Sequence, residues 1–303
     1  MLDAKIHTLI TVAKTRSFTR AARELSLTQP AVSHHINQLE KELGITLFIR
    51  KKGALQLTKQ GDLALKYARR LVALNEGLQR ELWDEEHNIK HLRIGITHTA
   101  ESNLVAQVLA QYGSEHPDVL ITIITDSIKK LYNRLENYEL DIAIVDDSPI
   151  GRSLNSLLLD TDYLVCAMAN ENQLSSRAML TIDDIRKERM ILRLPKSGTI
   201  NLFVDTLRSL GRSIDEFNVI LEVDNIATIK DLVRLNMGVS ILPYSTCLDE
   251  VQKGKMTVLS VENMSMMRQT NIVYQQDFSH KEILQDLLQL YKERSRRFRS
   301  VYR

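Results

Sequence analysis

The sequence predicts an α/β domain of two Rossmann-like lobes, preceded by an all-α domain with a winged helix-turn-helix and by a long linker helix. Three observations lead to this fold class. Residues 17–44 hold two apolar stripes at helical spacing with a turn between them, residues 59–86 hold one long narrow stripe, and from residue 92 short apolar runs alternate with amphipathic helices. A length of 303 residues also suits about two domains.

Two short helices between Ser17 and Gly44 form the predicted helix-turn-helix. The second opens at Thr28, whose hydroxyl can accept a hydrogen bond from a first-turn N–H, and it has Pro30 in that turn, where no donor is needed. Gly44 ends it, and a support helix over residues 3–14 completes the core. The apolar residues expected on the buried faces are Phe18, Ala21, Ala22 and Leu25 in the first helix, and Val32, Ile36, Leu39 and Leu43 in the second.

The opposite faces of these helices are polar and predict contact with DNA. Uncharged donors and acceptors near a helix N-terminus suit base edges and phosphates, and arginines suit phosphates. An ordinary amphipathic helix pair would show the same periodicity, so this pattern alone leaves both interpretations open. The outward residues are Gln29, Ser33, His34 and Asn37 in the second helix, and Arg16, Arg20 and Arg23 in and before the first.

A basic hairpin follows and favours the DNA-binding interpretation. Residues 47–58 read as two strands around a turn that carries the cations Arg50, Lys51 and Lys52, the expected form of a wing that touches phosphate. Residues 1–60 hold ten Lys or Arg against four Asp or Glu, a net charge of +6, whereas the whole chain carries +2 and the remainder therefore −4. A basic N-terminal part followed by an acidic remainder is expected when only the N-terminal part binds a polyanion.

The linker is one predicted helix from Thr58 to about Glu86. The apolar residues of this helix form a narrow stripe with steps of four and three residues, close to the spacing of a coiled-coil seam. Such a helix either packs on its own domain or pairs with a second copy of itself, and we favour dimerisation. The expected domains are residues 1–58, 59–88 and 89–303, the last with one lobe of residues 89–161 and 266–303 and another of residues 162–265. The stripe consists of Tyr67, Leu71, Leu74, Leu78 and Leu82.

The body alternates strands and helices in the manner of a mostly parallel sheet. Expected strands cover residues 92–97, 119–124, 141–145, 163–169, 190–194, 219–223, 239–242, 256–259 and 270–274. Expected helices cover residues 103–116, 128–138, 182–187, 200–210 and 226–235, with a basic terminal helix from residue 281. Segments that cross near residues 161 and 266 would join the two lobes, and ligands of such folds bind in the crevice at the carboxyl ends of strands.

Four strand-to-helix junctions carry polar residues where that crevice should be. Helix N-terminal N–H groups, hydroxyls and a lysine suit a small anion. Ser, Thr and Asn are also the preferred helix caps, so each junction alone has a purely structural explanation. The junction with Lys196 and Gly198 is less easily explained, because a cap needs neither neighbour. The expected ligand contacts are Thr97, His98 as an accessory group, Thr99, Ser102, Ser127, Lys196, Ser197, Thr199 and Asn225.

The residue pattern argues against several other classes. No metal-ligand spacing, P-loop or G-x-S-x-G elbow is present, so no metal, cofactor or catalytic residue is expected. Cys166 and Cys247 form neither a C-x-x-C pair nor a disulfide framework, which argues against a redox switch. The N-terminus does not have the form of a secretory signal and no stretch is long enough to span a bilayer, which predicts a cytoplasmic protein.

The chain closely resembles the LysR-type transcriptional regulators in the order of these parts. The resemblance is strongest from Ser17 to Gly61, SFTRAARELSLTQPAVSHHINQLEKELGITLFIRKKGALQLTKQG. Weaker similarities are LDIAIV, PKSGT, DNIATIKDLV and GVSILP in the body. The resemblance implies a winged DNA-binding domain, a dimerising linker helix and an effector domain similar to periplasmic solute-binding proteins, often in tetramers that bend promoter DNA. The implied partners are double-stranded promoter DNA, a small-molecule effector, further copies of the chain and RNA polymerase.

The resemblance also assigns residues by position. It places DNA contact at Thr28, Gln29, Pro30, Ser33, His34 and the wing cations, and effector contact at Thr97, Thr99, Ser127, Ser197, Thr199 and Asn225. Many members of the family have an arginine in the recognition helix where this chain has His34 and His35. The oxidant-sensing members have paired cysteines in the segment after the SGT-like motif, and here that segment has none.

The leading hypothesis is a transcriptional regulator, not an enzyme, that is controlled by a small anionic metabolite. One alternative is a soluble small-molecule carrier or α/β enzyme whose N-terminal domain serves only assembly, although assembly needs no basic wing. A second is a DNA-processing enzyme, which would need a nucleophile or a carboxylate cluster beside the helix-turn-helix.

Overall fold

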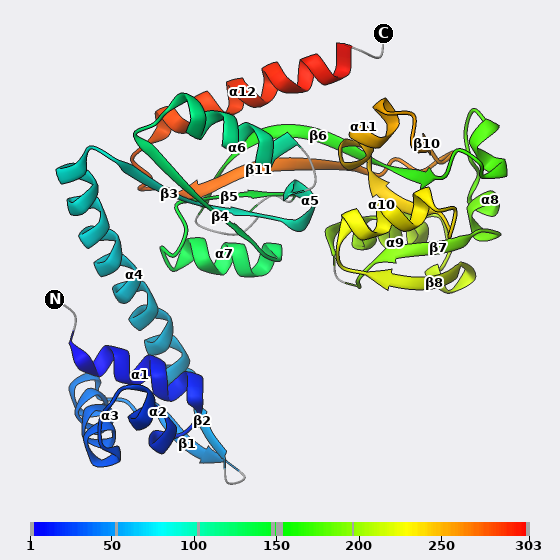
Figure 1. Cartoon of the computed structure of the whole chain (residues 1–303). Coiled ribbons are helices and arrows are strands. Elements are labelled where there is room, and N and C mark those ends of the chain that lie inside the picture. Colours follow the sequence, from blue (N-terminus) through cyan, green and yellow to red (C-terminus); the bar gives the residue numbers. More distant parts are fainter. Residues whose placement is uncertain are drawn as a thin grey trace. The chain divides into compact units, whose positions relative to one another are not determined.

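The computed structural model describes residues 3–51, 54–101, 104–146, 149, 154–195 and 197–300 (Figure 1). Three residues predicted to bind DNA or effector, Lys52, Ser102 and Lys196, lie outside the described residues. The chain divides into two compact units, residues 1–91 with 133–140 and residues 92–132 with 141–303.

Three helices build the core of the first unit: α1 (Ala4–Thr15), α2 (Phe18–Glu24) and α3 (Gln29–Leu43). The predicted start and end of α3 are confirmed. The Thr28 hydroxyl accepts a hydrogen bond from the Ala31 N–H at 3.3 Å, and Gly44 takes the left-handed conformation, with φ of 67°, that commonly follows a helix. The buried cluster between the helices includes Leu9, Val12, Ala21, Ala22, Val32, Ile36 and Leu39.

One residue of the predicted apolar face of α3 is not buried. Leu43 is 51% exposed, so the prediction for this residue was wrong. It is the last residue of α3 and lies outside the cluster that α1 and α2 form with the earlier turns of the helix. The buried stripe of α3 therefore ends at Leu39.

The wing is a two-stranded antiparallel hairpin of β1 (Phe48–Lys51) and β2 (Ala54–Leu57), as the sequence predicts. It is fastened to the helix-turn-helix by two contacts. The Glu40 carboxylate of α3 accepts a hydrogen bond from the Leu47 N–H at 2.6 Å, and the rings of Phe18 and Phe48 meet edge to face with centroids 6.1 Å apart. The orientation of the wing is thus set by α2 and α3.

The linker helix α4 (Lys59–His87) begins directly after the wing, and the Thr58 hydroxyl caps it by accepting a hydrogen bond from the Gly61 N–H at 2.8 Å. Leu65 and Ala68 on its first turns join the core of the first unit. A second apolar face of the same helix is open to solvent. It holds the five residues of the predicted dimerisation stripe, each between 47% and 60% exposed: Tyr67, Leu71, Leu74, Leu78 and Leu82.

The first lobe of the second unit is a sheet in the order β4-β3-β5-β11-β6. Its strands are β3 (Lys90–Ile96), β4 (Val119–Thr125), β5 (Ile142–Val145), β6 (Leu154–Met168) and β11 (Met267–Gln275). β3 and β5 are parallel, and β11 runs antiparallel to both β5 and β6. Helices α6 (Leu104–Glu115) and α12 (Lys281–Ser300) lie side by side against this sheet (Figure 1), with Val105, Val108, Leu284 and Leu287 in their shared buried cluster.

The second lobe continues from the last part of β6, which pairs with β9 (Ser240–Pro243) and β10 (Thr257–Leu259). β7 (Arg189–Arg193) and β8 (Asn218–Val223) are parallel and join this sheet through a bridge from Met190 to Val239. Helix α9 (Gly198–Ser209) packs in one buried cluster, and α10 (Ile226–Arg234) with α11 (Tyr244–Gln252) packs in another. β6 therefore belongs to both lobes.

Several elements differ from the sequence prediction. The sheet was expected to be mostly parallel, but β11 pairs antiparallel with β5 and β6, and β6 with β9 and β10. The short helix α5 (His98–Glu101) was not predicted. β6 starts at Leu154 instead of residue 163, because its backbone pairs with β11 along residues 154–163 even though polar side chains such as Ser156 and Asp160 interrupt the apolar run. α11 was not predicted at all. It begins after Pro243 without a side-chain cap, so the usual sequence mark of a helix start is missing.

Candidate functional site

The outward face of α3 carries the predicted DNA-contacting side chains. Gln29, Pro30, His34 and Asn37 are exposed and Ser33 is half-buried. The Gln29 amide Nε2 donates a hydrogen bond to the Ser33 hydroxyl at 2.7 Å, so these two side chains, one helical turn apart, form one polar group on the surface. The last three residues of α3, Lys41, Glu42 and Leu43, lie away from this group, so the polar row occupies the N-terminal part of the helix.

The two adjacent histidines of α3 face different ways. His34 is exposed, whereas Nδ1 of His35 lies 2.9 Å from the Thr8 hydroxyl of α1. Thr8 is buried and also donates to the Ala4 carbonyl oxygen at 3.0 Å. His35 therefore braces α3 against α1, and of the two histidines only His34 is placed on the outward face.

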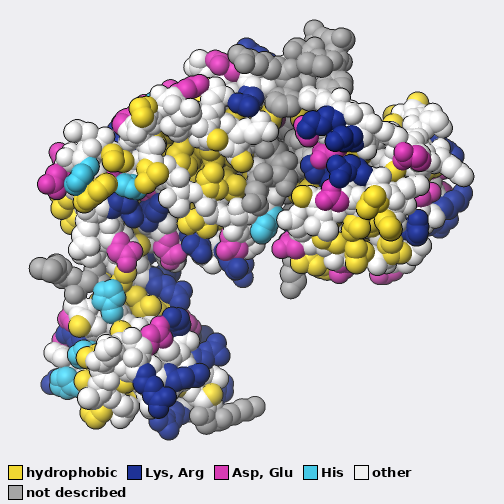
Figure 2. Space-filling view, in the orientation of Figure 1, with side chains coloured by type: hydrophobic (Ala, Val, Ile, Leu, Met, Phe, Trp, Pro, Cys, Tyr) yellow, Lys and Arg dark blue, Asp and Glu magenta, His cyan; other side chains and the backbone are white. Residues whose placement is uncertain are grey.

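The cations of the first unit differ in their surroundings. Lys5 pairs with Glu42 at 2.6 Å and Lys14 with Glu24 at 2.5 Å, so part of the positive charge is neutralised within the unit. The predicted phosphate contacts Arg16, Arg20, Arg50 and Lys51 are all exposed, as is Thr28. Figure 2 shows Lys and Arg side chains gathered over the part of the unit that carries α2 and the wing.

The predicted effector-contacting residues fall into three groups by burial. Thr97, Thr99 and Thr199 are buried, whereas Ser127 before α7 (Ile128–Glu136) and Asn225 are exposed, and His98 and Ser197 are half-buried. Three side chains act as helix caps, in line with the structural explanation. The Thr97 hydroxyl accepts a hydrogen bond from the Ala100 N–H of α5 (His98–Glu101). The Ser197 hydroxyl accepts one from the Ile200 N–H, and the Asn225 amide oxygen accepts one from the Thr228 N–H.

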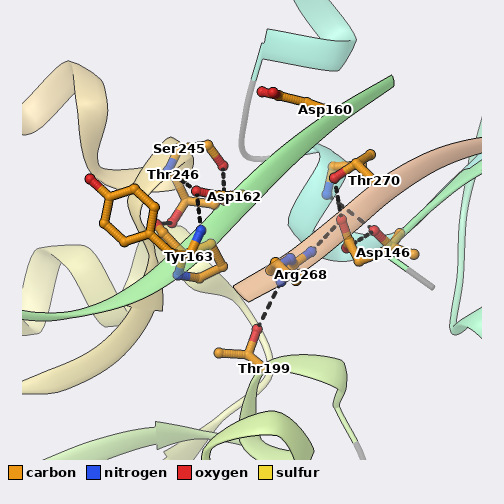
Figure 3. A network of polar contacts seen from close by, with 12 residues as sticks. Asp146, Asp160, Asp162, Tyr163, Thr199, Ser245, Thr246, Arg268 and Thr270 are labelled. Atoms are coloured by element: carbon orange, nitrogen blue, oxygen red, sulfur yellow. Dashed lines mark hydrogen bonds and ion pairs between the residues drawn. The ribbon is translucent and has the colours of Figure 1, made fainter. Parts of the chain in front are cut away.

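Two of the buried threonines, Thr97 and Thr199, belong to one polar network. Figure 3 shows its members Asp146, Thr199, Arg268 and Thr270. The Thr97 hydroxyl donates to Oδ2 of Asp146 at 2.8 Å, and the Thr270 hydroxyl donates to Oδ1 of the same carboxylate at 3.0 Å. The Arg268 guanidinium forms an ion pair with that carboxylate, and its Nη1 donates to the Thr199 hydroxyl at 3.5 Å. Both partners of the ion pair are almost completely buried.

Arg268 connects the two lobes through this network. Asp146 directly follows β5 of the first lobe, Thr199 lies in the first turn of α9 of the second, and Arg268 comes from β11. A buried guanidinium held by a buried carboxylate is a charge-assisted contact with fixed geometry. The structure therefore brings Thr97 and Thr199, which are far apart in the sequence, to either side of one ion pair.

A second carboxylate flanks Arg268. Asp162 of β6 is buried, and its Oδ2 accepts a hydrogen bond from the Ser245 hydroxyl at 2.7 Å (Figure 3). Burial raises the pKa of Asp162 above its ordinary value, and the hydrogen bonds from Ser245 and Tyr163 and the charge of Arg268 oppose that shift. Arg268 therefore has a second buried carboxylate near it besides Asp146.

Two family models match the chain. Residues 4–62 match "Bacterial regulatory helix-turn-helix protein, lysR family" and residues 85–296, well over half of the chain, match "LysR substrate binding domain". The chain belongs to the LysR family. It is thus a DNA-binding transcriptional regulator with an effector-binding domain.

Individual proteins agree with this assignment. The HTH-type transcriptional regulator CfxR of Cupriavidus necator is 30% identical over 272 residues, which cover 87% of this chain and 82% of CfxR. Full-length CbnR, solved in complex with its target DNA, has a TM-score of 0.67 at 16% identity and covers 97% of this chain and 99% of its own. The regulatory domain of CcmR from Synechocystis PCC6803, solved in complex with 2-PG, has a TM-score of 0.60 at 21% identity and covers 67% of this chain and 98% of its own.

Sequence reasoning missed the charged residues of the network in this LysR-family protein. Asp146 could have been found, because it follows a predicted buried strand at the carboxyl end where ligands bind. Arg268 and Thr270 alternate with Met267 and Gln269 on β11, which reads as an ordinary amphipathic strand. Only the fold shows that this face of β11 points to the interior between the lobes.

The thiols of this LysR-family chain have no reactive setting. Cys166 and Cys247 are both buried and free. Burial raises the pKa of both thiols, that of Cys247 to about 12. Among the described residues no three His, Cys, Asp or Glu side chains gather as metal ligands, and no described helix is long and apolar enough to cross a membrane.

Proposed function

We propose that this LysR-family regulator reads promoter DNA with the N-terminal half of α3 and holds the phosphate backbone with the wing and α2. The observation that carries this proposal is the division of α3 into two faces. His35 and Glu40 fasten its inner side to α1 and to the wing, which leaves the polar row outside to reach base edges. The proposed contacts are Arg16, Arg20, Thr28, Gln29, Pro30, Ser33, His34, Asn37, Arg50, Lys51 and Lys52.

The proposed functional form is at least a dimer formed through the exposed stripe of α4. An apolar seam with steps of four and three residues, open to solvent along a helix of 29 residues, suits a second copy of the same helix. Two winged domains held in this way would read half-sites about one helical turn of DNA apart, or a multiple of it. RNA polymerase bound at the same promoter is a further proposed partner.

The proposed effector is a small anionic metabolite bound between the two lobes. The network around Arg268 supports this, because it places a buried cation beside threonine hydroxyls of both lobes. The structure of the CcmR regulatory domain with 2-PG supports a small ligand in a domain of this fold. The proposed contacts are Thr97, His98, Thr99, Ser102, Ser127, Lys196, Ser197, Thr199 and Asn225.

We also infer that the protein acts by binding and not by catalysis, as a ligand-dependent change in how the lobes or subunits pack would suffice to alter the promoter complex. Relatives such as CfxR are described as transcriptional regulators, which supports this.

Footprinting tests the DNA-binding proposal. Purified full-length protein should protect a defined region of the promoter upstream of its own gene or of a neighbouring divergent gene, at concentrations well below those of non-specific binding. A thermal-shift screen of small metabolites weighted towards carboxylates and phosphates should identify the effector, because a specific ligand stabilises the folded state by mass action. Protection that appears only at non-specific concentrations would refute the assignment of α3.

A further inference from the structure

A second buried arginine, Arg193, lies near the network and lacks the partners that a buried guanidinium needs. It is the last residue of β7 and only 4% exposed. Its Nη2 donates to Oδ1 of Asp224 at 3.3 Å, but the side chain of Asp224 is itself 59% exposed. Nε and Nη1 of Arg193 have no acceptor among the residues that the structure describes. Buried donors without acceptors are costly, so this arrangement requires an explanation.

Arg268 has a similar deficit. Its Nη1 and Nη2 are used by Thr199 and Asp146, while its Nε has no acceptor within the described part of the chain. The two arginines are close enough to influence one another electrostatically. Burial lowers the pKa of Arg193, the charge of Asp224 opposes this shift, and the charge of Arg268 adds to it. The interior at this point therefore holds two cations, and three of their nitrogen atoms have no acceptor among the described residues.

The helices around the two arginines add positive potential. Arg193 ends β7, and α9 starts a few residues later with Ser197 as its cap; Asp224 and Asn225 lead from β8 into α10 in the same way. α9 has 12 residues and α10 has 9, so each presents first-turn N–H groups and the positive end of its dipole. The two arginines and the two helix N-termini attract an anion, whereas the carboxylates of Asp146, Asp162 and Asp224 oppose it.

A structural role alone does not account for these observations. An arginine kept only for stability would have its five donors satisfied by fixed acceptors, because each unsatisfied buried donor weakens the fold. The Nε–H and Nη1–H groups of Arg193 lie on different edges of its planar guanidinium, so each is offered to a separate acceptor oxygen.

We propose that Arg193 and Arg268 recognise an oxoanion group of the effector, a carboxylate or a phosphate, whose oxygens accept hydrogen bonds from donors of the two guanidinium groups that have no acceptor among the described residues. This inference rests on the proposed ligand-responsive function and adds to it the residues that select the ligand. Asp146 acts as an internal competitor, because its carboxylate occupies the Arg268 guanidinium together with Thr97 and Thr270. A ligand with a second acid group would exchange with Asp146, whereas a neutral analogue would leave the two arginines unpaired.

The test uses full-length protein and two simple probes, inorganic phosphate and malonate. Thermal unfolding is measured at rising probe concentration, with sodium chloride at matched ionic strength as the reference. The wild type should show a saturable increase in Tm with at least one oxoanion beyond the effect of chloride, and the preferred probe separates phosphate from carboxylate ligands. In Arg193→Met this increase should disappear, and in Arg193→Lys, which keeps the charge but loses the planar set of directed donors, the half-saturating concentration should rise about tenfold.

A matched control is Arg208→Met. Arg208 lies on α9 of the same lobe, is 71% exposed and pairs with Asp205, so its removal should leave the oxoanion response unchanged. Without oxoanion, Arg193→Met should be at least as stable as the wild type, because it removes a poorly compensated buried charge. If that variant does not fold, Arg193→Lys carries the test alone.

Two results would overturn the inference: an unaltered half-saturating concentration in the Arg193 variants, or a wild type that phosphate and malonate stabilise no more than chloride does. A mobility-shift assay of the same proteins with promoter DNA keeps the two proposals apart. Loss of the oxoanion response with intact DNA binding concerns the effector site only, whereas loss of DNA binding in the wild type would refute the proposed function itself.

Discussion

The hydroxyl of Thr97 donates a hydrogen bond to Oδ2 of Asp146 at 2.8 Å, and the other oxygen of that carboxylate receives Arg268 and Thr270. A threonine that sequence reasoning assigns to the effector is therefore already part of the protein's own polar network. A ligand bound as proposed, against Thr97, has to share this hydroxyl with Asp146 or take it over. In the proposed site, ligand binding and the contact between the lobes would for this reason be coupled through one carboxylate.

Removing that carboxylate should destabilise the protein strongly. Asp146→Ala leaves the buried Arg268 without its ion-pair partner, and breaking one side of a buried pair costs roughly 3–5 kcal/mol of unfolding free energy. Urea unfolding followed by circular dichroism measures this cost. The matched control is Asp205→Ala, which breaks an exposed pair with Arg208 and should cost less than about 1 kcal/mol.

The double variant Asp146→Ala with Arg268→Met completes the cycle. It should recover part of the loss, because no buried charge is then left unpaired. Equal costs for Asp146→Ala and Asp205→Ala would mean that water replaces the carboxylate freely and that the network does not hold the lobes.

The first unit could be predicted from the sequence in nearly every respect, because its structure depends on local rules. The Thr28 cap, Pro30 in the first turn and Gly44 after the last turn fix α3 within a span of 17 residues. The error at Leu43 has a simple origin: helical periodicity says which side a residue faces, but not how far the packing partner extends along the helix.

The proposed effector site could be predicted only in part. Thr97 and Thr199 stand out as polar residues after strands, but they are also cap residues, and Thr97 does cap α5. Asp146, Arg193 and Arg268 are charged residues whose burial follows from tertiary packing, since β11 crosses to the first lobe more than a hundred residues after β5. No local pattern distinguishes a buried arginine on a strand from an exposed one.

Asp162 should make the stability of the protein depend on pH. Burial raises the pKa of this carboxyl in the folded state above its ordinary value of 3.8. The folded state therefore keeps the proton that the unfolded state has lost, so the contribution of the group is fully favourable below pH 3.8 and is lost as the pH rises through the raised pKa. Asp162→Asn stays neutral and should gain stability relative to the wild type from pH 4 to pH 7.

Urea unfolding of Asp162→Asn and wild type at several pH values in this range provides the measurement. The Asn amide oxygen can still accept a hydrogen bond from Ser245, so the comparison isolates the charge. A difference in unfolding free energy that stays constant with pH would contradict the raised pKa.

The wing and the recognition helix should respond differently to substitution. Arg50→Ala with Lys51→Ala removes two exposed cations and should weaken binding to all DNA sequences alike, with the salt slope reduced by about 0.9 for each lost phosphate contact. Gln29→Ala or Ser33→Ala should instead reduce the preference for the specific site by roughly 1–3 kcal/mol.

Fluorescence anisotropy over a range of salt concentrations, on specific and scrambled DNA, separates the two effects. Lys14→Ala is the control for charge, because the Lys14 ammonium is already paired with Glu24 and its loss should change the salt slope little. Identical behaviour of the wing and Gln29 variants would show that α3 does not read bases.

The stripe of α4 should determine the association of the chain. Leu74→Asp places a charge in the middle of the proposed seam and should raise the dimer dissociation constant at least about a hundredfold, since both copies lose the contact. Sedimentation velocity detects the shift to monomer. Glu76→Lys changes a residue that is also exposed but lies two positions away, on another side of the helix, and should leave the dimer intact.

Two glycines of α4 should respond to alanine in opposite directions. A Cβ at Gly61 would lie 2.2 Å from the carbonyl oxygen of Leu47, which accepts the hydrogen bond of the Thr58 N–H at 3.0 Å. Gly61→Ala must therefore displace backbone between the wing and α4, at a cost of roughly 1–3 kcal/mol. At Gly77 the nearest atom to an added Cβ is the Arg80 guanidinium at 3.7 Å, so Gly77→Ala should stabilise the helix by about 1 kcal/mol.

Thermal unfolding and DNA affinity together test this pair. Gly61→Ala should lower both, because the displaced wing no longer matches the phosphate positions that α3 sets, while Gly77→Ala should raise the Tm and leave affinity unchanged. Since Thr58 caps α4 through the Gly61 N–H, the same substitution also strains the start of the linker, and amide exchange should rise at residues 58–62 before it rises elsewhere. A Gly61→Ala protein with wild-type stability and affinity would show that the wing is not held by this close backbone contact.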